Sequence, residues 1–233
     1  MISEPTTSES LSNIPVTPTS YAATSLLTYQ EAFEEMYIED IHTDQNNEVS
    51  ILSADGVKFD IEIDLFSCYW DASVETCIVI TERSQCHECG AYIDGAIFNR
   101  TGEGWKLRSF RSNITEIGNK GQVIKTEIIQ IGPAKQAVQL KWIYSSTGTT
   151  VEHLVIFEGS GNSFDVILEL GSRGETYNLE GGWNTNLYFQ KTNEFGDYYH
   201  LIVTYYGNGK GKPYSEFYTF SDGKYNLVPK KSE

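Results

Sequence analysis

The chain has 233 residues, of which 32 are acidic and 17 are basic, so its formal net charge is -15. Nucleic-acid affinity comes largely from Lys and Arg that displace counterions. The strongly acidic composition of this chain therefore argues against a DNA or RNA partner. No apolar run approaches the ~20 residues of a transmembrane helix, and the start lacks the segments of a signal peptide. We expect a soluble protein, cytoplasmic as the sequence stands, or periplasmic or secreted if an export signal was trimmed.

The first part of the chain divides into a tail and a helix. Residues 1–24 are rich in Ser, Thr and Pro and poor in large apolar side chains, so they cannot offset the entropy lost on ordering. We predict a disordered tail. Over residues 25–40 apolar side chains recur at helical spacing, and Thr28 with Glu31 forms a capping-box pattern. Residues 25–44 are therefore assigned to one helix and the start of a polar linker, 42–47, which contains His42.

Short strands separated by turn residues account for the rest. Segments 49–53 and 57–66 flank Asp55-Gly56, which is typical of a hairpin with a tight primed turn. Further strands are predicted at 74–81, 123–131, 137–144, 150–158, 164–170, 183–191, 198–206, 214–220 and 224–228. Gly-rich and Ser-rich turns between them indicate an antiparallel meander. We assign residues 45–233 to a single all-β domain closing into a sandwich or barrel, with a propeller fragment as the alternative.

The second arm of the hairpin alternates between apolar and charged residues. Its buried face is predicted to carry Val57, Phe59, Ile61, Ile63 and Leu65. Asp60, Glu62 and Asp64 should share the opposite, wet face. A calcium site is the alternative for this acidic row, but same-face residues of a strand lie ~7 Å apart, too far to surround one ion without other donors.

The four cysteines fall within 22 positions, at Cys68, Cys77, Cys86 and Cys89. An even count permits two disulfides with three connectivities, whereas in a reducing compartment a C-x-x-C pair more often binds metal or does redox work. We favour a local disulfide between Cys86 and Cys89. The alternative is a zinc site formed by Cys86, Cys89, His87 and Cys77. Cys77 lies in an apolar strand, where a buried free thiol is the ordinary outcome.

Aromatic residues are concentrated near the C-terminus. Seven tyrosines fall in the last three predicted strands and their connections: Tyr198, Tyr199, Tyr205, Tyr206, Tyr214, Tyr218 and Tyr225. Flat amphipathic rings suit sugar and peptide ligands, but tyrosine is also a good strand residue. An aromatic binding face is therefore weighed against ordinary sheet packing.

Two segments carry a resemblance. The run from Cys86 to Phe98, CHECGAYIDGAIF, continues into the hairpin GEGWKL, and the chain closes with DYYHLIV and YTFSDGKY. These segments resemble a group of uncharacterised bacterial all-β proteins with a C-H-x-C corner and a D-Y-Y-x-L / Y-x-F-x-D-G-x-Y ending. The resemblance implies a shared fold over about residues 76–228 and no catalytic residue.

No nucleophile, base and orienting group are found at a recognisable spacing. We therefore expect a non-catalytic binding or accessory protein whose partner is a protein, a small molecule or a carbohydrate, with Cys86 and Cys89 bracing a corner. The alternative is a thiol-dependent zinc or redox protein that acts through the same two cysteines.

Overall fold

The computed structural model describes residues 26–37, 40–43, 49–53, 55–71, 74–86, 90–118, 121–146, 149–160, 163–171, 183–191, 196–207 and 212–229. These residues form one helix, α1 (Tyr29–Met36), and fourteen strands. All strand pairs are antiparallel, and neighbouring strands in each sheet follow one another in sequence. The predicted all-β class and antiparallel meander are thereby confirmed. The predicted disordered tail, 1–24, lies outside the described residues.

Three sheets divide the strands. Sheet A consists of β1 (Asp40–Thr43), β2 (Val49–Leu52), β3 (Lys58–Asp71), β4 (Val74–Ser84), β5 (Ala91–Thr101) and β6 (Gly104–Ile117). Sheet B consists of β7 (Gly121–Gly132), β8 (Lys135–Ser146), β9 (Thr149–Ser160) and β10 (Ser163–Leu170). Sheet C consists of β11 (Trp183–Gln190), β12 (His200–Gly207), β13 (Tyr214–Ser221) and β14 (Lys224–Leu227).

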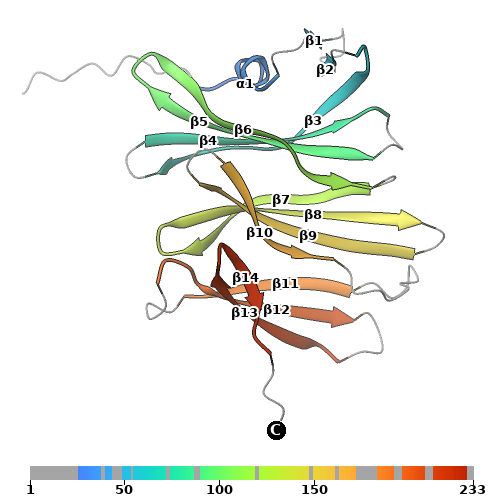
Figure 1. Cartoon of the computed structure of the whole chain (residues 1–233), viewed down its shortest axis with the longest axis vertical. Helices are drawn as coiled ribbons and strands as arrows, with labels where there is room; N and C mark the ends of the chain where they lie inside the picture. The colour runs from blue at the N-terminus through green and yellow to red at the C-terminus, as the bar shows by residue number, and fades with distance from the viewer. Residues whose placement is uncertain are drawn as a thin grey trace, which may run out of the picture.

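The sheets are stacked as layers, with sheet B between sheets A and C and with α1 on the far side of sheet A (Figure 1). The sandwich or barrel form expected from the sequence is not confirmed, because the strands are distributed over three sheets. The structure contains no helix, within the described residues, that has the length and apolar composition of a membrane span.

Each interface in the stack has its own apolar core. Between sheets A and B the largest buried side chains include Ile80, Phe157 and Phe164. Between sheets B and C, Ile156 and Leu201 are fully buried in a second cluster. Sheet B is therefore covered on both faces, which explains why consecutive residues of its central strands are buried, 137–142 in β8 and 154–158 in β9.

Helix α1 covers the outer face of sheet A. Thr28 is its N-cap and forms the predicted capping box, because its hydroxyl accepts from the Glu31 amide while the Glu31 carboxylate accepts from the Thr28 amide. Phe33 and Met36 are buried against sheet A, in a cluster that includes Phe59 and Phe98. The short helix is thus held chiefly by its apolar face, as helices of two turns generally are.

Polar contacts join the layers at a few points. Arg111 of β6 donates to the carbonyl oxygen of Phe164 in β10, between sheets A and B. Between sheets B and C, the Tyr199 amide donates to the Ile131 carbonyl at 2.7 Å, and Lys141 donates to the Thr185 carbonyl at 2.9 Å. These bonds fix how the layers are positioned on one another, which the apolar contacts alone would leave loosely specified.

The sequence predictions for the linker 42–47 and for the hairpin that follows it each need a correction. The pairing of β3 with β4 shifts between Ile63 and Leu65, so Leu65 packs toward sheet B while Ile63 packs toward α1. A β-bulge of this kind reverses the direction of all later side chains. The polar linker was the second error, because its first residue, His42, lies in strand β1.

Candidate functional site

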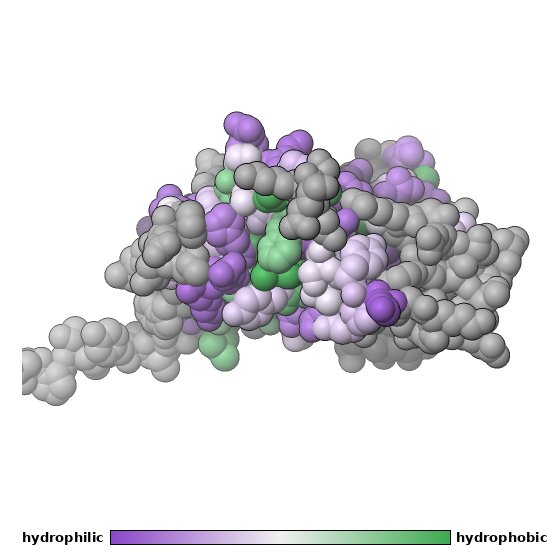
Figure 2. All heavy atoms as spheres, turned by 90° about the horizontal axis from the view of Figure 1, so that it is seen from below, coloured by the Kyte–Doolittle hydropathy of each residue, from purple (hydrophilic) through white to green (hydrophobic). Residues whose placement is uncertain are grey.

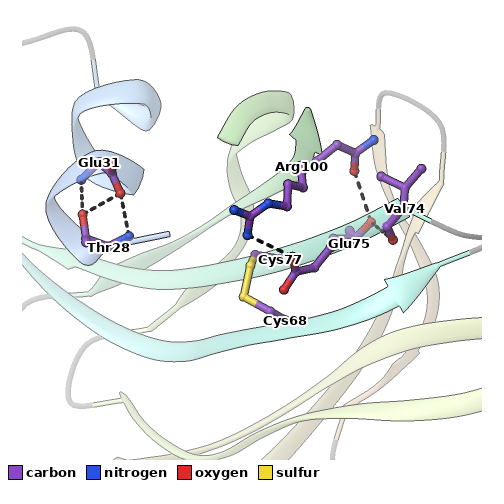
Figure 3. Close-up of a disulfide and its surroundings, with 9 residues drawn as sticks. Thr28, Glu31, Cys68, Val74, Glu75, Cys77 and Arg100 are labelled. Carbon is purple, nitrogen blue, oxygen red and sulfur yellow. Dashed lines mark hydrogen bonds and ion pairs between the residues drawn. A yellow bond between two sulfur atoms is a disulfide. The ribbon is translucent and has the colours of Figure 1, made fainter. Parts of the chain in front are cut away.

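Cys68 and Cys77 form a disulfide between neighbouring strands (Figure 3). The two residues lie directly opposite each other in the register of β3 and β4, and their Cα atoms are 4.0 Å apart. Cys77 is fully buried, as expected, but it is not the free thiol that its apolar strand suggested. While the disulfide is intact, Cys77 has no thiolate to offer a metal.

The predicted Cys-His-Glu-Cys corner is described only in part. Cys86 is exposed and disulfide-bonded, whereas His87 and Cys89 lie outside the described residues. Among the residues that are described, no group of three or more His, Cys, Asp or Glu side chains is arranged to hold a metal ion. The zinc site of Cys86, Cys89, His87 and Cys77 therefore stays a prediction.

The most extensive buried polar network surrounds Asp94 of β5, whose side chain is fully buried. Its carboxylate accepts from Arg83 Nε at 2.9 Å, from the Tyr37 hydroxyl at 3.0 Å and from the Asn113 amide at 2.8 Å. The Tyr37 hydroxyl also lies 2.7 Å from the Thr81 hydroxyl. Burial and the Asp94 charge raise the pKa of Tyr37 far above its usual value. A buried carboxylate with this many donors stabilises the fold and is poorly placed to take part in a reaction.

A cleft lies beside α1 and the edge of sheet A. It has a volume of about 800 Å³, within the ~300–1,000 Å³ range of small-molecule sites. Its apolar lining comes from α1 and the first three strands: Tyr29, Phe33, Ile41, Val49, Ile61 and Ile63. Its polar lining consists of Gln30, Thr43, Asp60, Glu62, Glu82 and Ser84. The lining thus contains three carboxylates and no lysine or arginine.

A further carboxylate, Asp64, lies close to Glu62 and Glu82. Glu62 and Glu82 are opposite each other in the β3–β4 register, and Asp64 is at the β-bulge that follows. Burial, together with the negative charges of Glu82 and Glu62, raises the pKa of Asp64 to about 7. Its Oδ2 atom is buried and accepts no hydrogen bond from the described protein groups. The region therefore has an excess of negative charge that an added cation would relieve.

The tyrosine-rich C-terminal strands mostly face the core. Tyr199, Tyr218 and Tyr225 are buried between sheets B and C, and burial raises the pKa of Tyr205 to about 12. Of the seven tyrosines near the C-terminus, only Tyr206 and Tyr214 are exposed. The side chains that do face outward from sheet C include Tyr188 and Phe217, and the sequence analysis singled out neither as a ligand contact.

The cleft was also missed from the sequence. Its apolar residues look like ordinary core positions, and only the acidic row of β3 was noticed. The acidic row of β3 and the amphipathic helix that precedes it could together have indicated a binding site. In the structure, Tyr29 of this helix is 57% exposed. Comparison of the chain with protein-family models, with curated proteins and with solved structures finds no match.

Proposed function

We propose that the protein is a non-catalytic binding protein and that the cleft beside α1 takes a small ligand with an apolar body and a positive charge. The observation that carries this proposal is the composition of the cleft, whose lining combines six apolar residues with three carboxylates and contains no lysine or arginine. An apolar body would replace water against Tyr29 and Phe33. A protonated amine would lie beside Glu62 and Glu82.

The negative charge of the cleft determines which sign of charge a ligand should carry. An anionic group would add to the repulsion that already raises the pKa of Asp64, whereas a cation would be attracted to the carboxylates and would favour the ionised form of Asp64.

Three probes with one apolar body test the proposal: tryptamine, tryptophol and indole-3-acetate, which are cationic, neutral and anionic at pH 8. Isothermal titration calorimetry should show tryptamine binding ~10-fold more tightly than tryptophol, a difference of ~1.4 kcal/mol, and indole-3-acetate binding least. Glu62→Gln should remove most of the preference for tryptamine and leave tryptophol binding unchanged.

Glu116→Gln is the matched control, because Glu116 is exposed on β6 and does not line the cleft. It should leave all three affinities unchanged. Equal affinity for the three probes, or no binding by any of them, would overturn the assignment of the ligand class.

The alternative function, a zinc or redox role for Cys86 and Cys89, is favoured by one observation: the disulfide-bonded Cys86 is exposed, where a reductant could reach it. This proposal is tested on reduced protein by zinc analysis and by following the thiol titre against redox buffers. A C86S/C89S variant is the comparison. Reduced protein that holds no zinc and shows no reversible thiol chemistry would exclude this role.

A further inference from the structure

Sheet C ends the stack, and no helix or sheet of the described residues packs on its outer face (Figure 1). Sheet B packs on its inner face, where Leu201 and Val203 of β12 are fully buried. Successive strand residues point to opposite faces, so Ile202 and Thr204 point away from the stack. Figure 2 looks onto this end of the molecule and shows an apolar strip lying between hydrophilic side chains.

Four apolar side chains form a row across this outer face. Tyr188 of β11 is opposite Ile202 of β12, and Ile202 is opposite Phe217 of β13. Val228, just after β14, donates its amide to the Phe217 carbonyl and so completes the row. Tyr188 is 62% exposed, Phe217 51% and Val228 41%. The apolar row therefore extends across β11, β12 and β13 to the residue that follows β14, and it is open to solvent.

The apolar row is flanked by uncharged polar side chains. On one side are Asn186, Thr204 and Ser215, and on the other Gln190, His200, Thr219 and Asn226. None of these outward strand positions is acidic, although the chain contains 32 acidic residues. Two copies of a chain with a formal charge of -15 repel each other, and a face without carboxylates is where they can approach at least cost.

We infer that the outer face of sheet C binds a second copy of this chain, with the two sheets packed face to face. The cleft beside α1 is not lined by any residue of the apolar row, and small ligands prefer concave sites. A flat partner fits a flat face. A two-fold axis in the plane between the copies sets one apolar row against the other, as in the isologous interfaces of most dimers.

The area of the outer face of sheet C determines the affinity that we expect for the dimer. Three strands of eight residues and one of four, ~4.8 Å apart, cover roughly 450 Å² of each copy, so the pair buries on the order of 900 Å². This is the lower end for a specific interface. The dimer should therefore be reversible, with a Kd on the order of 1–100 μM. This inference goes beyond the ligand-binding proposal and involves a different face of the molecule.

Sedimentation velocity on the full chain from about 1 to 200 μM tests the inference. The wild-type protein should shift reversibly from monomer to dimer. Raising NaCl from about 50 to 500 mM should tighten the dimer severalfold, because salt screens the repulsion between two acidic chains. Phe217→Glu, which places a carboxylate in the middle of both rows, should weaken dimerisation at least ~100-fold.

Ile124→Glu is the matched control, because Ile124 is 46% exposed on β7, away from sheet C. It adds the same charge and should leave the dimer unchanged. Tyr188→Glu, at the other end of the apolar row, provides a second disrupting variant, and circular dichroism verifies that each variant is folded. A wild-type chain that is monomeric at 200 μM, or a dimer that survives both substitutions in folded protein, would overturn the inference without affecting the cleft.

Discussion

Glu62 of β3 lies directly opposite Glu82 of β4, so two negative charges face each other across neighbouring strands beside the candidate ligand cleft. Such pairs destabilise a sheet. Close to this pair, partial burial and the negative charges of Glu82 and Glu62 raise the pKa of Asp64 to about 7. The pH dependence of folding should report this arrangement.

Asp64→Asn should stabilise the protein at pH 8 but not at pH 4. In the folded state Asp64 keeps its proton up to about pH 7, and in the unfolded chain it loses the proton near the model value of 3.8. The wild-type protein therefore loses stability as the pH rises from about 4 to 7. The amide, which is neutral throughout, should raise the free energy of unfolding by ~2–4 kcal/mol at pH 8.

Urea unfolding at the two pH values measures this effect. Asp60→Asn on the same strand is the control, since Asp60 is exposed and paired only with Lys58 at the surface. A gain in Asp64→Asn of equal size at both pH values would show that the raised pKa is not the cause.

Tyr37→Phe should destabilise the protein by ~1–3 kcal/mol. The substitution removes the hydroxyl that donates to Asp94 and contacts Thr81, and it leaves the ring in place against Phe110. Thermal or urea unfolding gives the change. Tyr29→Phe at the start of α1 is the control and should cost little, because Tyr29 is largely exposed. Equal losses in the two variants would contradict a special role for the Asp94 network.

Replacing Cys68 and Cys77 together by serine should lower the free energy of unfolding by ~2–3 kcal/mol. A disulfide that closes a loop of about nine residues restricts the unfolded chain by roughly this amount. Urea unfolding of the double variant, compared with the wild type before and after reduction, measures the loss. A reduced wild-type protein that is as stable as the oxidised one would show that the disulfide adds nothing to the fold.

Gly132→Ala should disturb the contact between sheets B and C. A Cβ atom at this position would overlap the carbonyl oxygen of Asp197, which is backbone and cannot rotate away. We expect a loss of more than ~2 kcal/mol, read out by thermal unfolding. Gly118→Ala is the matched control, because its nearest neighbour, the Tyr144 ring, is at an ordinary 3.6 Å. Similar stability of the two variants would contradict the close approach of the sheets at Gly132.

The individual elements were predictable because their signals are local. The capping box of Thr28 and Glu31 involves residues that are near one another in sequence, and so does the hairpin turn at Asp55-Gly56, where Gly56 has a positive φ of 80°. The turn differs from the predicted tight primed turn, because the Gly56 amide donates to the Ser53 carbonyl and the Ser53 amide donates to the Val57 carbonyl, which is the pattern of a longer hairpin loop. The strands in sheets B and C likewise follow from alternating side chains bounded by turn residues. Such patterns depend little on the rest of the fold.

The arrangement of the sheets was not predictable in the same way. Alternation shows that a strand has two faces, but it does not show which sheet covers each face, so the tyrosines of β12 and β13 could be placed only after the stack was known. The bulge at Asp64 reversed the predicted direction of Leu65 without any glycine to mark it. The cleft was missed because its walls come from α1, β1, β2, β3 and β4, which are brought together only by tertiary packing.

Because every sheet is built from consecutive strands, a ribosome delivers one complete sheet before the next begins. Each finished layer then offers an apolar surface on which the following four strands can assemble, so the loops that must close stay short and folding can proceed vectorially. Sheet C is the last layer formed, and no later part of the described chain covers its outward side.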